Sequence, residues 1–430
     1  MRPWGTIVSD PAEAADRRGR PDGDREPGAD QRTAADRMAG ADQQPRADRQ
    51  PDPDREPGAA QRSDFADVRV LVAGDGLAVS YCAKLLGDAG AEVVLVEPAD
   101  GHALRRWRCG QPVEPGTTGA LFRYLHYGHR SVTSAGPEVL ASADIVVVER
   151  TGPLGDPASL AAAHPGTVVV AISPYGLDGP YAAEPWSELT LQAGCGSCGA
   201  RGRPETPPLQ MGGHLLEWVS GVYAAAGALA ALRSARRCGL GELVDVSMLE
   251  VGNLSASLYA DLSDAIRGRP DLANLPPARS YETPSIEPTA DGYVGFNTNT
   301  RLQFEAFCLM IERPELIDDP RNFASIVSRN VHWADWQEIV HGWTTQHTTA
   351  EIVELAASLR IPVAPVGDAE SMLALDHLVE RQVYLDGPER EFLVPRRPWR
   401  IDGHPIPGLR PAPEPGEADG RLADHRPVAA

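Results

Sequence analysis

Val68-Arg-Val-Leu-Val-Ala-Gly-Asp-Gly76 and Ala91-Glu-Val-Val-Leu-Val-Glu-Pro98 are two apolar runs that each end in a turn. Both runs are about six residues long and rich in valine, as buried β-strands are. The residues between them, about 79–87, have helical composition, and Gly90 ends that segment. A strand, a crossover helix and a second strand predict two parallel strands joined by a right-handed connection.

Two further apolar runs, Ser142–Val148 and Thr167–Ile172, predict additional strands of the same sheet. A short helix is expected between them at 157–163. Leu215–Arg233 is rich in alanine and leucine and contains no proline, which predicts a long buried helix. The first half of the chain is therefore predicted to be a doubly wound α/β domain.

The composition changes at about residue 250, where a proline-rich stretch begins. Helices expected near 302–312 and 333–345 favour a smaller α+β domain after that point. The terminal segments are polar and rich in proline and glycine, which is typical of segments that do not pack a core. The predicted organisation is a disordered polar tail at 1–64, a discontinuous large domain at 65–235 and 346–412, a small domain at 250–345 and a flexible C-terminal tail at 413–430.

Composition excludes several classes of protein. The chain has 430 residues, 42% of them hydrophobic and 23% charged, and a formal net charge of -20. This acidic balance argues against nucleic acid as a partner, since nucleic-acid-binding surfaces are basic. The six cysteines are sparse for the length, which favours a reduced, cytoplasmic protein. No uninterrupted apolar run reaches the roughly 18 residues that span a bilayer, so no membrane association is expected.

A loop after the strand at 167–172 contains a candidate functional residue. The loop begins at Pro174 and includes Gly179-Pro180. In open α/β sheets, ligands bind beyond the carboxyl ends of the strands. Glu188 follows this loop at the start of a new segment. Its carboxylate could be a nucleophile or a general base, or one of the acidic residues that are common in a first helical turn.

Two motifs suggest cofactors only weakly. Gly74-x-Gly76, with Glu97 after the next strand, has the layout of a dinucleotide fingerprint. The glycine of the helix-packing position is absent, so no nicotinamide cofactor is expected. Cys195 and Cys198 have the spacing of half a zinc site. The sequence has no second cysteine pair at that spacing, so no metal is expected.

Two basic groups follow predicted strand ends. In so acidic a chain they suit a phosphate-bearing ligand, although solvated surface arginines explain them equally well. The first group is Arg105, Arg106 and Arg108, and the second is Arg123, His129 and Arg130.

Taken in order, several segments resemble the class III CoA-transferase family, the CaiB/BaiF-like group of formyl-CoA and carnitine-CoA transferases. The resemblance extends over about residues 68–400. The similar segments are Arg69–Cys82, Leu85–Pro98, His126–Val132, Ala143–Val148, Ile172–Tyr181, Gly239–Leu249, Asp291–Val294 and Ile361–Val366.

This resemblance implies an α/β fold with a Rossmann-like large domain, a smaller α+β domain, and two subunits threaded together as an interlocked-ring homodimer. It implies coenzyme A or acyl-CoA as a substrate and small carboxylic acids as partners. In the family's chemistry a carboxylate attacks the acyl-CoA and forms a mixed anhydride. The CoA thiolate returns to give an enzyme-bound thioester, from which an acceptor acid takes the CoA.

The resemblance also assigns the catalytic residues. The family's nucleophilic Asp corresponds to Glu188, and a second family Asp, four residues before Gly221, corresponds to Glu217 as an accessory carboxylate. A Glu carries the same functional group as an Asp. Its extra methylene moves the carboxylate by about 1 Å or more, which can cost about a hundredfold in rate unless the pocket has shifted too.

The resemblance assigns CoA binding to Glu97, Arg105, His129 and Arg130, with Gln192 at the pocket wall. His129 stands where family members carry a Lys. The predicted function is transfer of CoA between carboxylic acids.

Two alternatives to this function stay open. One is a racemase-like isomerase of 2-methylacyl-CoA, against which Ser187 counts, because the racemase branch has a His there. The other is a degenerate member that binds CoA thioesters without turnover, since Glu replaces Asp at both acidic positions, Glu188 and Glu217.

Overall fold

The computed structural model describes residues 65–107, 117–198, 207–256, 283–388, 390, 392–400 and 409–422. The disordered tail predicted at 1–64 lies outside these residues, as does the end of the predicted C-terminal tail.

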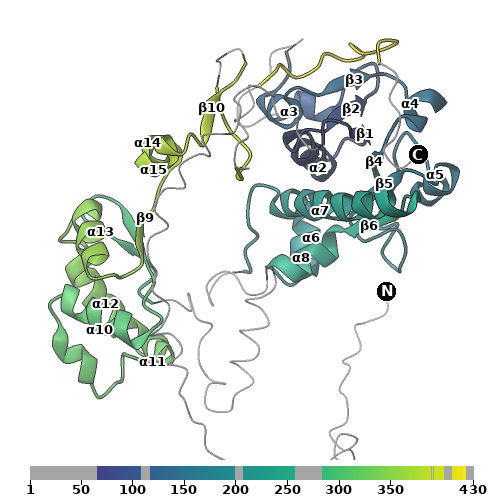
Figure 1. The fold of residues 1–430 in the computed structure, drawn as a ribbon. Helices are drawn as coiled ribbons and strands as arrows, with labels where there is room; N and C mark the ends of the chain where they lie inside the picture. The colour runs from purple at the N-terminus through teal and green to yellow at the C-terminus, as the bar shows by residue number, and fades with distance from the viewer. Residues whose placement is uncertain are drawn as a thin grey trace, which may run out of the picture. The chain divides into compact units, whose positions relative to one another are not determined.

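The large domain is built on a six-stranded parallel sheet with the strand order β3-β2-β1-β4-β5-β6 (Figure 1). This is the order of a doubly wound Rossmann sheet, in which the order reverses between β1 and β4 and ligands bind beyond the carboxyl ends of those strands. The four predicted strands are confirmed as β1 (Arg69–Ala73), β2 (Glu92–Val96), β4 (Ile145–Glu149) and β5 (Val168–Ser173). The structure adds β3 (Arg130–Val132) and β6 (Leu243–Ser247) at the two edges of the sheet.

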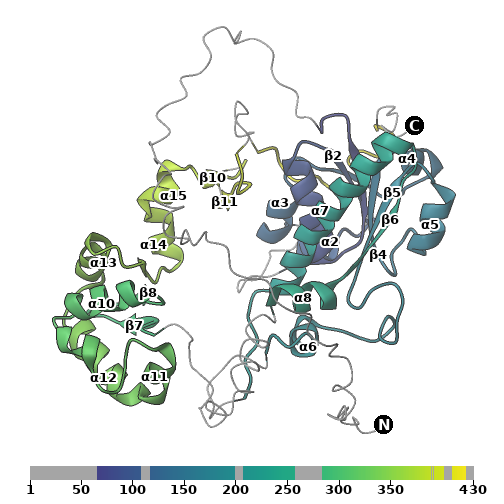
Figure 2. The ribbon, with the colours of Figure 1, turned by 60° about the horizontal axis from the view of Figure 1, so that its bottom comes forward.

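Helices cover both faces of this sheet (Figure 2). Alternate strand residues point to opposite faces. Val70 and Val147 therefore join the core beneath α2, α3 and α7, whereas Leu71 and Val146 pack on the other face, where residues of α4 and α5 join them. The bounds are α2 (Leu77–Asp88), η2 (Ala103–Arg106), α3 (Ala120–His126), α4 (Pro137–Ala141), α5 (Pro157–Ala163), α6 (Glu188–Gly194), α7 (Leu215–Cys238) and α8 (Met248–Ala256).

The long helix α7 packs closely on α2. A Cβ added at Gly221 would lie 2.8 Å from the Ala78 carbonyl oxygen, so a glycine is required where the helices approach. By length and composition alone α7 could cross a membrane, contrary to the expectation that no segment would. Half of its most apolar window is buried inside the structure, as in the core helix of a globular domain.

The second core belongs to the small α+β unit. Its centre contains Phe304, Phe307, Trp336 and Ile352. Its antiparallel sheet has the order β7-β8-β9, with β7 (Ile286–Pro288), β8 (Tyr293–Phe296) and β9 (Val363–Pro365). Its helices are α10 (Arg301–Met310), η3 (Pro314–Asp318), α11 (Ile326–Val331), α12 (Trp333–Thr344) and α13 (Thr349–Ser358). The remaining elements are α14 (Ala369–Ala374), α15 (Asp376–Glu380), β10 (Tyr384–Asp386) and β11 (Leu393–Pro395).

Three predicted boundaries are corrected. The segment 346–366 was assigned to the large domain, but α13 packs in the small core and β9 pairs with β8. The segment 250–256 was assigned to the small domain, but it completes α8, whose Val251 lies in the large core. The C-terminal tail was expected to be flexible from 413, yet Ala418 is 2% exposed and its N–H donates to the Ser131 carbonyl.

Candidate active site

Glu188 lies at the N-termini of two helices. Ser187 caps α6 by accepting a hydrogen bond from Thr190 N, so Glu188 is the first residue of that helix. The backbone N–H of Leu216, in the first turn of α7, donates to Glu188 Oε1 at 2.9 Å. Helix N-termini carry a partial positive charge, which attracts acidic side chains.

Gln192 fixes the orientation of this carboxylate. Its Nε2 donates to Glu188 Oε1 at 2.7 Å and to the Met211 carbonyl at 2.8 Å. Its Oε1 accepts from Met211 N at 2.7 Å. Both N–H groups and the oxygen of this fully buried amide are thus engaged. The amide cannot turn without losing either Glu188 or the backbone that precedes α7.

The second oxygen of Glu188 is in a different state. Oε2 is buried and has no hydrogen-bond partner within the described part of the chain. The residue as a whole is 9% exposed. A buried polar atom without a partner costs free energy, and such an atom is commonly satisfied by a ligand or by chemistry at the site. Glu188 therefore has one anchored oxygen and one open oxygen, an arrangement that suits a nucleophile.

Glu217, in the first turn of α7, is paired with His214, which precedes the helix. Glu217 Oε1 and His214 Nδ1 are 2.7 Å apart. The His214 backbone is left-handed, with φ 56° and ψ 42°, and its ring meets that of Trp107 edge to face at 5.0 Å. Burial raises the pKa of Glu217. The charge of Glu188 also raises it, while His214 acts in the opposite direction.

The Gly74-Asp-Gly76 loop binds a carboxylate of the same chain. Glu149, the last residue of β4, accepts from Gly76 N at 3.0 Å and from Asp75 N at 3.4 Å. A Cβ at Gly76 would lie 2.5 Å from Glu149 Oε1, which explains the glycine. Burial raises the pKa of Glu149, and the charges of Asp75 and Glu217 add to the effect. In a dinucleotide-binding domain the equivalent loop approaches the pyrophosphate.

Three of these residues have the spacing of a possible metal site. Glu188, His214 and Glu217 each offer one ligand atom, and these atoms lie within 4.8 Å of one another. Two carboxylates and an imidazole suit several divalent ions. However, Glu188 Oε1, Glu217 Oε1 and His214 Nδ1 already make hydrogen bonds within the protein.

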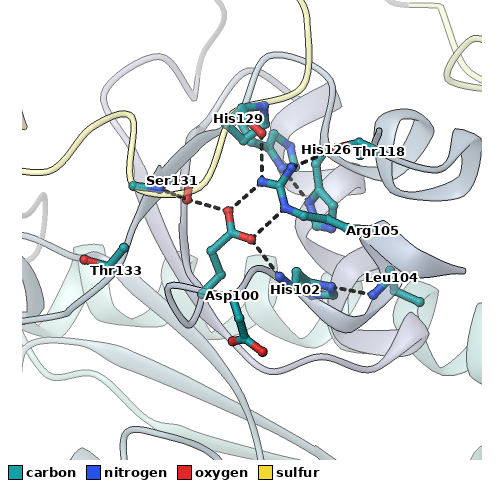
Figure 3. Close-up of polar contacts among 12 residues, drawn as sticks. Asp100, His102, Leu104, Arg105, Thr118, His126, His129, Ser131 and Thr133 are labelled. Atoms are coloured by element: carbon teal, nitrogen blue, oxygen red, sulfur yellow. Dashed lines mark hydrogen bonds and ion pairs between the residues drawn. The ribbon is translucent and has the colours of Figure 1, made fainter. Parts of the chain in front are cut away.

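Glu97 and Arg105, both predicted to bind CoA, pair with each other (Figure 3). Arg105 Nε donates to Glu97 Oε2 at 2.8 Å and Nη2 donates to Oε1 at 2.6 Å. His102 N and Ser131 Oγ also donate to this carboxylate. Burial acts to raise the pKa of Glu97, but the hydrogen bonds, with Arg105 foremost, lower it overall. The two residues are 1% and 7% exposed, so the pair lies inside the domain rather than on an open face.

His129 lies in a buried group of histidines beside this ion pair. His126 Nδ1 and His129 Nδ1 are 3.2 Å apart, and the ring centres of His102 and His126 are 5.4 Å apart. Burial lowers the pKa of His129 to about 3, with help from the charge of Lys84, and holds that of His126 well below its usual value. His129 is 7% exposed, and its predicted contact with a CoA phosphate stays a prediction.

Arg130 has a more open side chain. Nη1 donates to Glu92 Oε1 at 3.0 Å and Nη2 donates to the Arg421 carbonyl at 3.0 Å, with the side chain 31% exposed. Partly exposed ion pairs contribute little to stability. The predicted role of Arg130 in binding a CoA phosphate is compatible with this position.

Sequence reasoning missed Glu149 and His214. The sequence does mark Glu149, because it is the one acidic residue of the strand Ile145–Glu149. It also stands at the carboxyl end of that strand, where ligands bind in open α/β sheets. His214 had a weaker signal, namely its position after Gly212-Gly213 and three residues before Glu217.

Comparison with known proteins identifies the family of the chain. Residues 65–419 match CoA-transferase family III. Over 339 residues the chain is 31% identical to succinyl-CoA–D-citramalate CoA-transferase of Chloroflexus aurantiacus, which covers 74% of this chain and 81% of that protein. It is 26% identical over 388 residues to succinate–glutarate CoA-transferase of Agrobacterium fabrum, covering 84% and 95%. A crystal structure of a CaiB/BaiF family protein from Brucella suis has the same fold, with TM-score 0.70, 22% identity and coverage of 84% and 98%.

The fold and the site define an α/β enzyme with a carboxylate centre at the carboxyl ends of its parallel strands. The chain belongs to CoA-transferase family III, the CaiB/BaiF family. It is a class III CoA-transferase that acts on acyl-CoA, and the predicted family and activity are confirmed.

Proposed function

We propose that Glu188 is the nucleophile of the CoA transfer. The observation that supports this most directly is its buried, unpartnered Oε2, held in place through Oε1 by Gln192 and by the first turn of α7. Anchoring one oxygen leaves the other poised, so little orientational freedom is lost when it attacks.

The proposed reaction balances without an external acid or oxidant. Glu188 Oε2 attacks the thioester carbonyl carbon, the C–S bond breaks, and CoA leaves as a thiolate, which gives a mixed anhydride. The thiolate then attacks the Glu188 carbonyl carbon and releases the donor acid. The acceptor carboxylate attacks the resulting glutamyl thioester, and the returning thiolate takes the acyl group of the new anhydride. Glu188 is thereby restored.

We also propose the substrate class and the assembly. The named relatives transfer CoA from or to dicarboxylic acids, succinate among them, which supports succinyl-CoA as a donor and small carboxylic acids as acceptors. A second copy of the chain, threaded as an interlocked homodimer, would cover the apolar side chains exposed on α6, α7 and α8. These include Leu189 at 53%, Tyr223 at 40% and Leu254 at 69%. Light scattering of the purified protein tests for this dimer.

Trapping the intermediate tests the nucleophile. The protein is incubated with succinyl-CoA and then with hydroxylamine, and peptides are analysed by mass spectrometry. A hydroxamate at Glu188 is expected. Glu188→Gln should remove it and lower kcat by at least about a thousandfold, whereas the matched control Glu184→Gln, an exposed acid on the preceding loop, should retain both. CoA exchange without an adduct at Glu188 would overturn this assignment.

A further inference from the structure

The site around Glu188 poses an electrostatic problem for a carboxylate acceptor. Carboxylate oxygens of Glu188 and Glu217 lie within 4.8 Å of each other. Glu217 also lies near enough to Glu149 for its charge to raise the pKa of Glu149. An acceptor acid brings another negative charge into this group. Some hydrogen-bond donor must therefore receive it, because like charges at such distances repel strongly in a partly buried site.

His214 is placed to be that donor. One of its ring nitrogens belongs to the same 4.8 Å group as the Glu188 carboxylate. Its side chain is 39% exposed, whereas that of Glu217 is 10% exposed. The imidazole is thus anchored at Nδ1 by a buried carboxylate, and more than a third of the His214 side chain is accessible to solutes.

The pairing with Glu217 determines which hydrogen His214 presents. When the pair is neutral overall, the proton between them lies either on Nδ1, facing a carboxylate, or on Glu217, facing a neutral ring. In both cases Nε2 carries a hydrogen, because the bridging proton occupies the Nδ1 side. Burial raises the pKa of Glu217, which favours retention of the bridging proton. As long as that proton is held, Nε2–H is available as a donor.

The local backbone keeps this ring in position. The αL conformation of His214 turns the chain immediately before α7, and Trp218 Nε1 donates to the Gly213 carbonyl at 3.0 Å. The Trp107 ring meets the imidazole at 5.0 Å. A non-glycine residue in the left-handed region is uncommon, and such strain concentrates at functional sites.

We propose that His214 binds the carboxylate of the CoA acceptor through Nε2–H and sets it beside the thioester formed on Glu188. This inference rests on the proposed function of Glu188. It also orders the reaction. A carboxylate at Glu188 would repel the acceptor, whereas the glutamyl thioester carries no charge and admits it. His214 therefore acts on the thioester state, where it holds the acceptor acid as it arrives and the donor acid as it leaves.

The test separates the two half-reactions. Adduct formation on Glu188 from succinyl-CoA measures the first half, and transfer of CoA to isotopically labelled succinate measures the second. His214→Asn is the central variant, because Asn tolerates the left-handed backbone but has no imidazole Nε2–H. We expect the KM for succinate to rise about tenfold or more, as for the loss of a charge-assisted hydrogen bond. The rate of adduct formation should change by less than about threefold.

Glu217→Gln provides a second variant should His214→Asn fail to fold. His164→Asn, at the residue that follows the last turn of α5, is the matched control. In the wild type the KM for succinate should rise with pH, because a group whose pKa is raised keeps its proton at low pH and loses it as the pH climbs. The charged groups that act on this pair are Glu188 and Glu149, and Asp75 lies beside Glu149. Glu217→Gln should flatten the profile.

The outcomes distinguish the two ideas. An adduct in the wild type together with an unchanged KM for succinate in His214→Asn overturns the role of His214 alone. The role of His214 is also overturned if His214→Asn slows adduct formation by the same factor as it raises the KM for succinate. A wild type that forms no adduct overturns the Glu188 mechanism and, with it, the order of binding inferred here.

Discussion

Two buried carboxylates of the large domain, Glu97 and Glu188, lie in opposite states. Each oxygen of Glu97 accepts two hydrogen bonds, one of them from Arg105. Glu188 accepts two bonds on Oε1 and none, within the described residues, on Oε2. Both residues were predicted to be functional, and their side chains are similarly hidden, at 1% and 9% exposed.

The difference teaches how to distinguish a buried scaffold acid from a catalytic one. A carboxylate whose lone pairs all accept hydrogen bonds has no free lone pair for a substrate. Its hydrogen bonds stabilise the fold instead. A carboxylate with one unpartnered oxygen is destabilised in the free protein and is stabilised when a ligand or a bond completes it. The completeness of the hydrogen bonding, more than the burial, therefore separates Glu97 from Glu188.

The largest expected effect comes from removing the ion-pair partner of Glu97. Arg105→Met leaves Glu97 as a buried charge without its ion pair, and we expect a loss of about 3–5 kcal/mol in unfolding free energy. Urea unfolding measures it. The double variant Glu97→Gln, Arg105→Met removes the stranded charge and should recover much of the loss. A single variant as stable as the wild type would show that the pair contributes nothing to the fold.

The next effect tests the fit of the site to a glutamate. Glu188→Asp shortens the side chain by one methylene, so Leu216 N and Gln192 can no longer anchor one oxygen while the other stays in place. We expect kcat to fall about a hundredfold with little change in stability. Glu97→Asp is the matched control and should lose stability while the chemical step survives. Equal or higher activity in Glu188→Asp would mean that the pocket is sized for the shorter acid.

Much of the fold was predictable because apolar runs and glycines act locally. The strands, the crossover helix α2 and the long helix α7 lie close to their predicted positions. The predictions that failed depend on contacts between residues far apart in the sequence. The pattern of α13 shows one apolar face but not which core that face joins, and it packs with Phe304 and Trp336. Likewise, composition marks residues near 418 as polar but does not reveal their contacts with β3.

The site residues likewise fall into those that the sequence identifies and those that depend on distant neighbours. Glu188, Glu217 and Gln192 were found through family resemblance, and the structure brings them together. Glu149 reaches the Gly74–Gly76 loop only because β4 lies next to β1, 73 residues away in sequence. No local pattern encodes that neighbour. The prediction that Arg105 binds CoA stays a prediction. Its side chain pairs with Glu97, and in sequence a basic residue near a strand end looks the same whether its partner is a phosphate or a buried carboxylate.

Acidification should destabilise the region around Glu97, where His126 and His129 are buried. The pKa of folded His129 is about 3, against about 6.5 in an unfolded chain, so the unfolded state binds more protons in between. Stability should therefore fall as the pH drops below about 6.5, by about 1.4 kcal/mol per pH unit for each such histidine. Urea unfolding at several pH values measures the slope. His126→Phe, which keeps a ring against Phe122, should reduce it by about half, and an unchanged slope would contradict this account.

The smallest expected effect concerns Arg130, the predicted CoA ligand that keeps a partly open side chain. Arg130→Gln should change the unfolding free energy by less than about 1 kcal/mol, because partly exposed ion pairs contribute little. If Arg130 binds the 3′-phosphate of CoA, the KM for succinyl-CoA should rise about tenfold. The thioester of dephospho-CoA lacks that phosphate, so the variant and the wild type should bind it equally. An equal loss with both thioesters would place Arg130, like Arg105, on the scaffold side of the comparison.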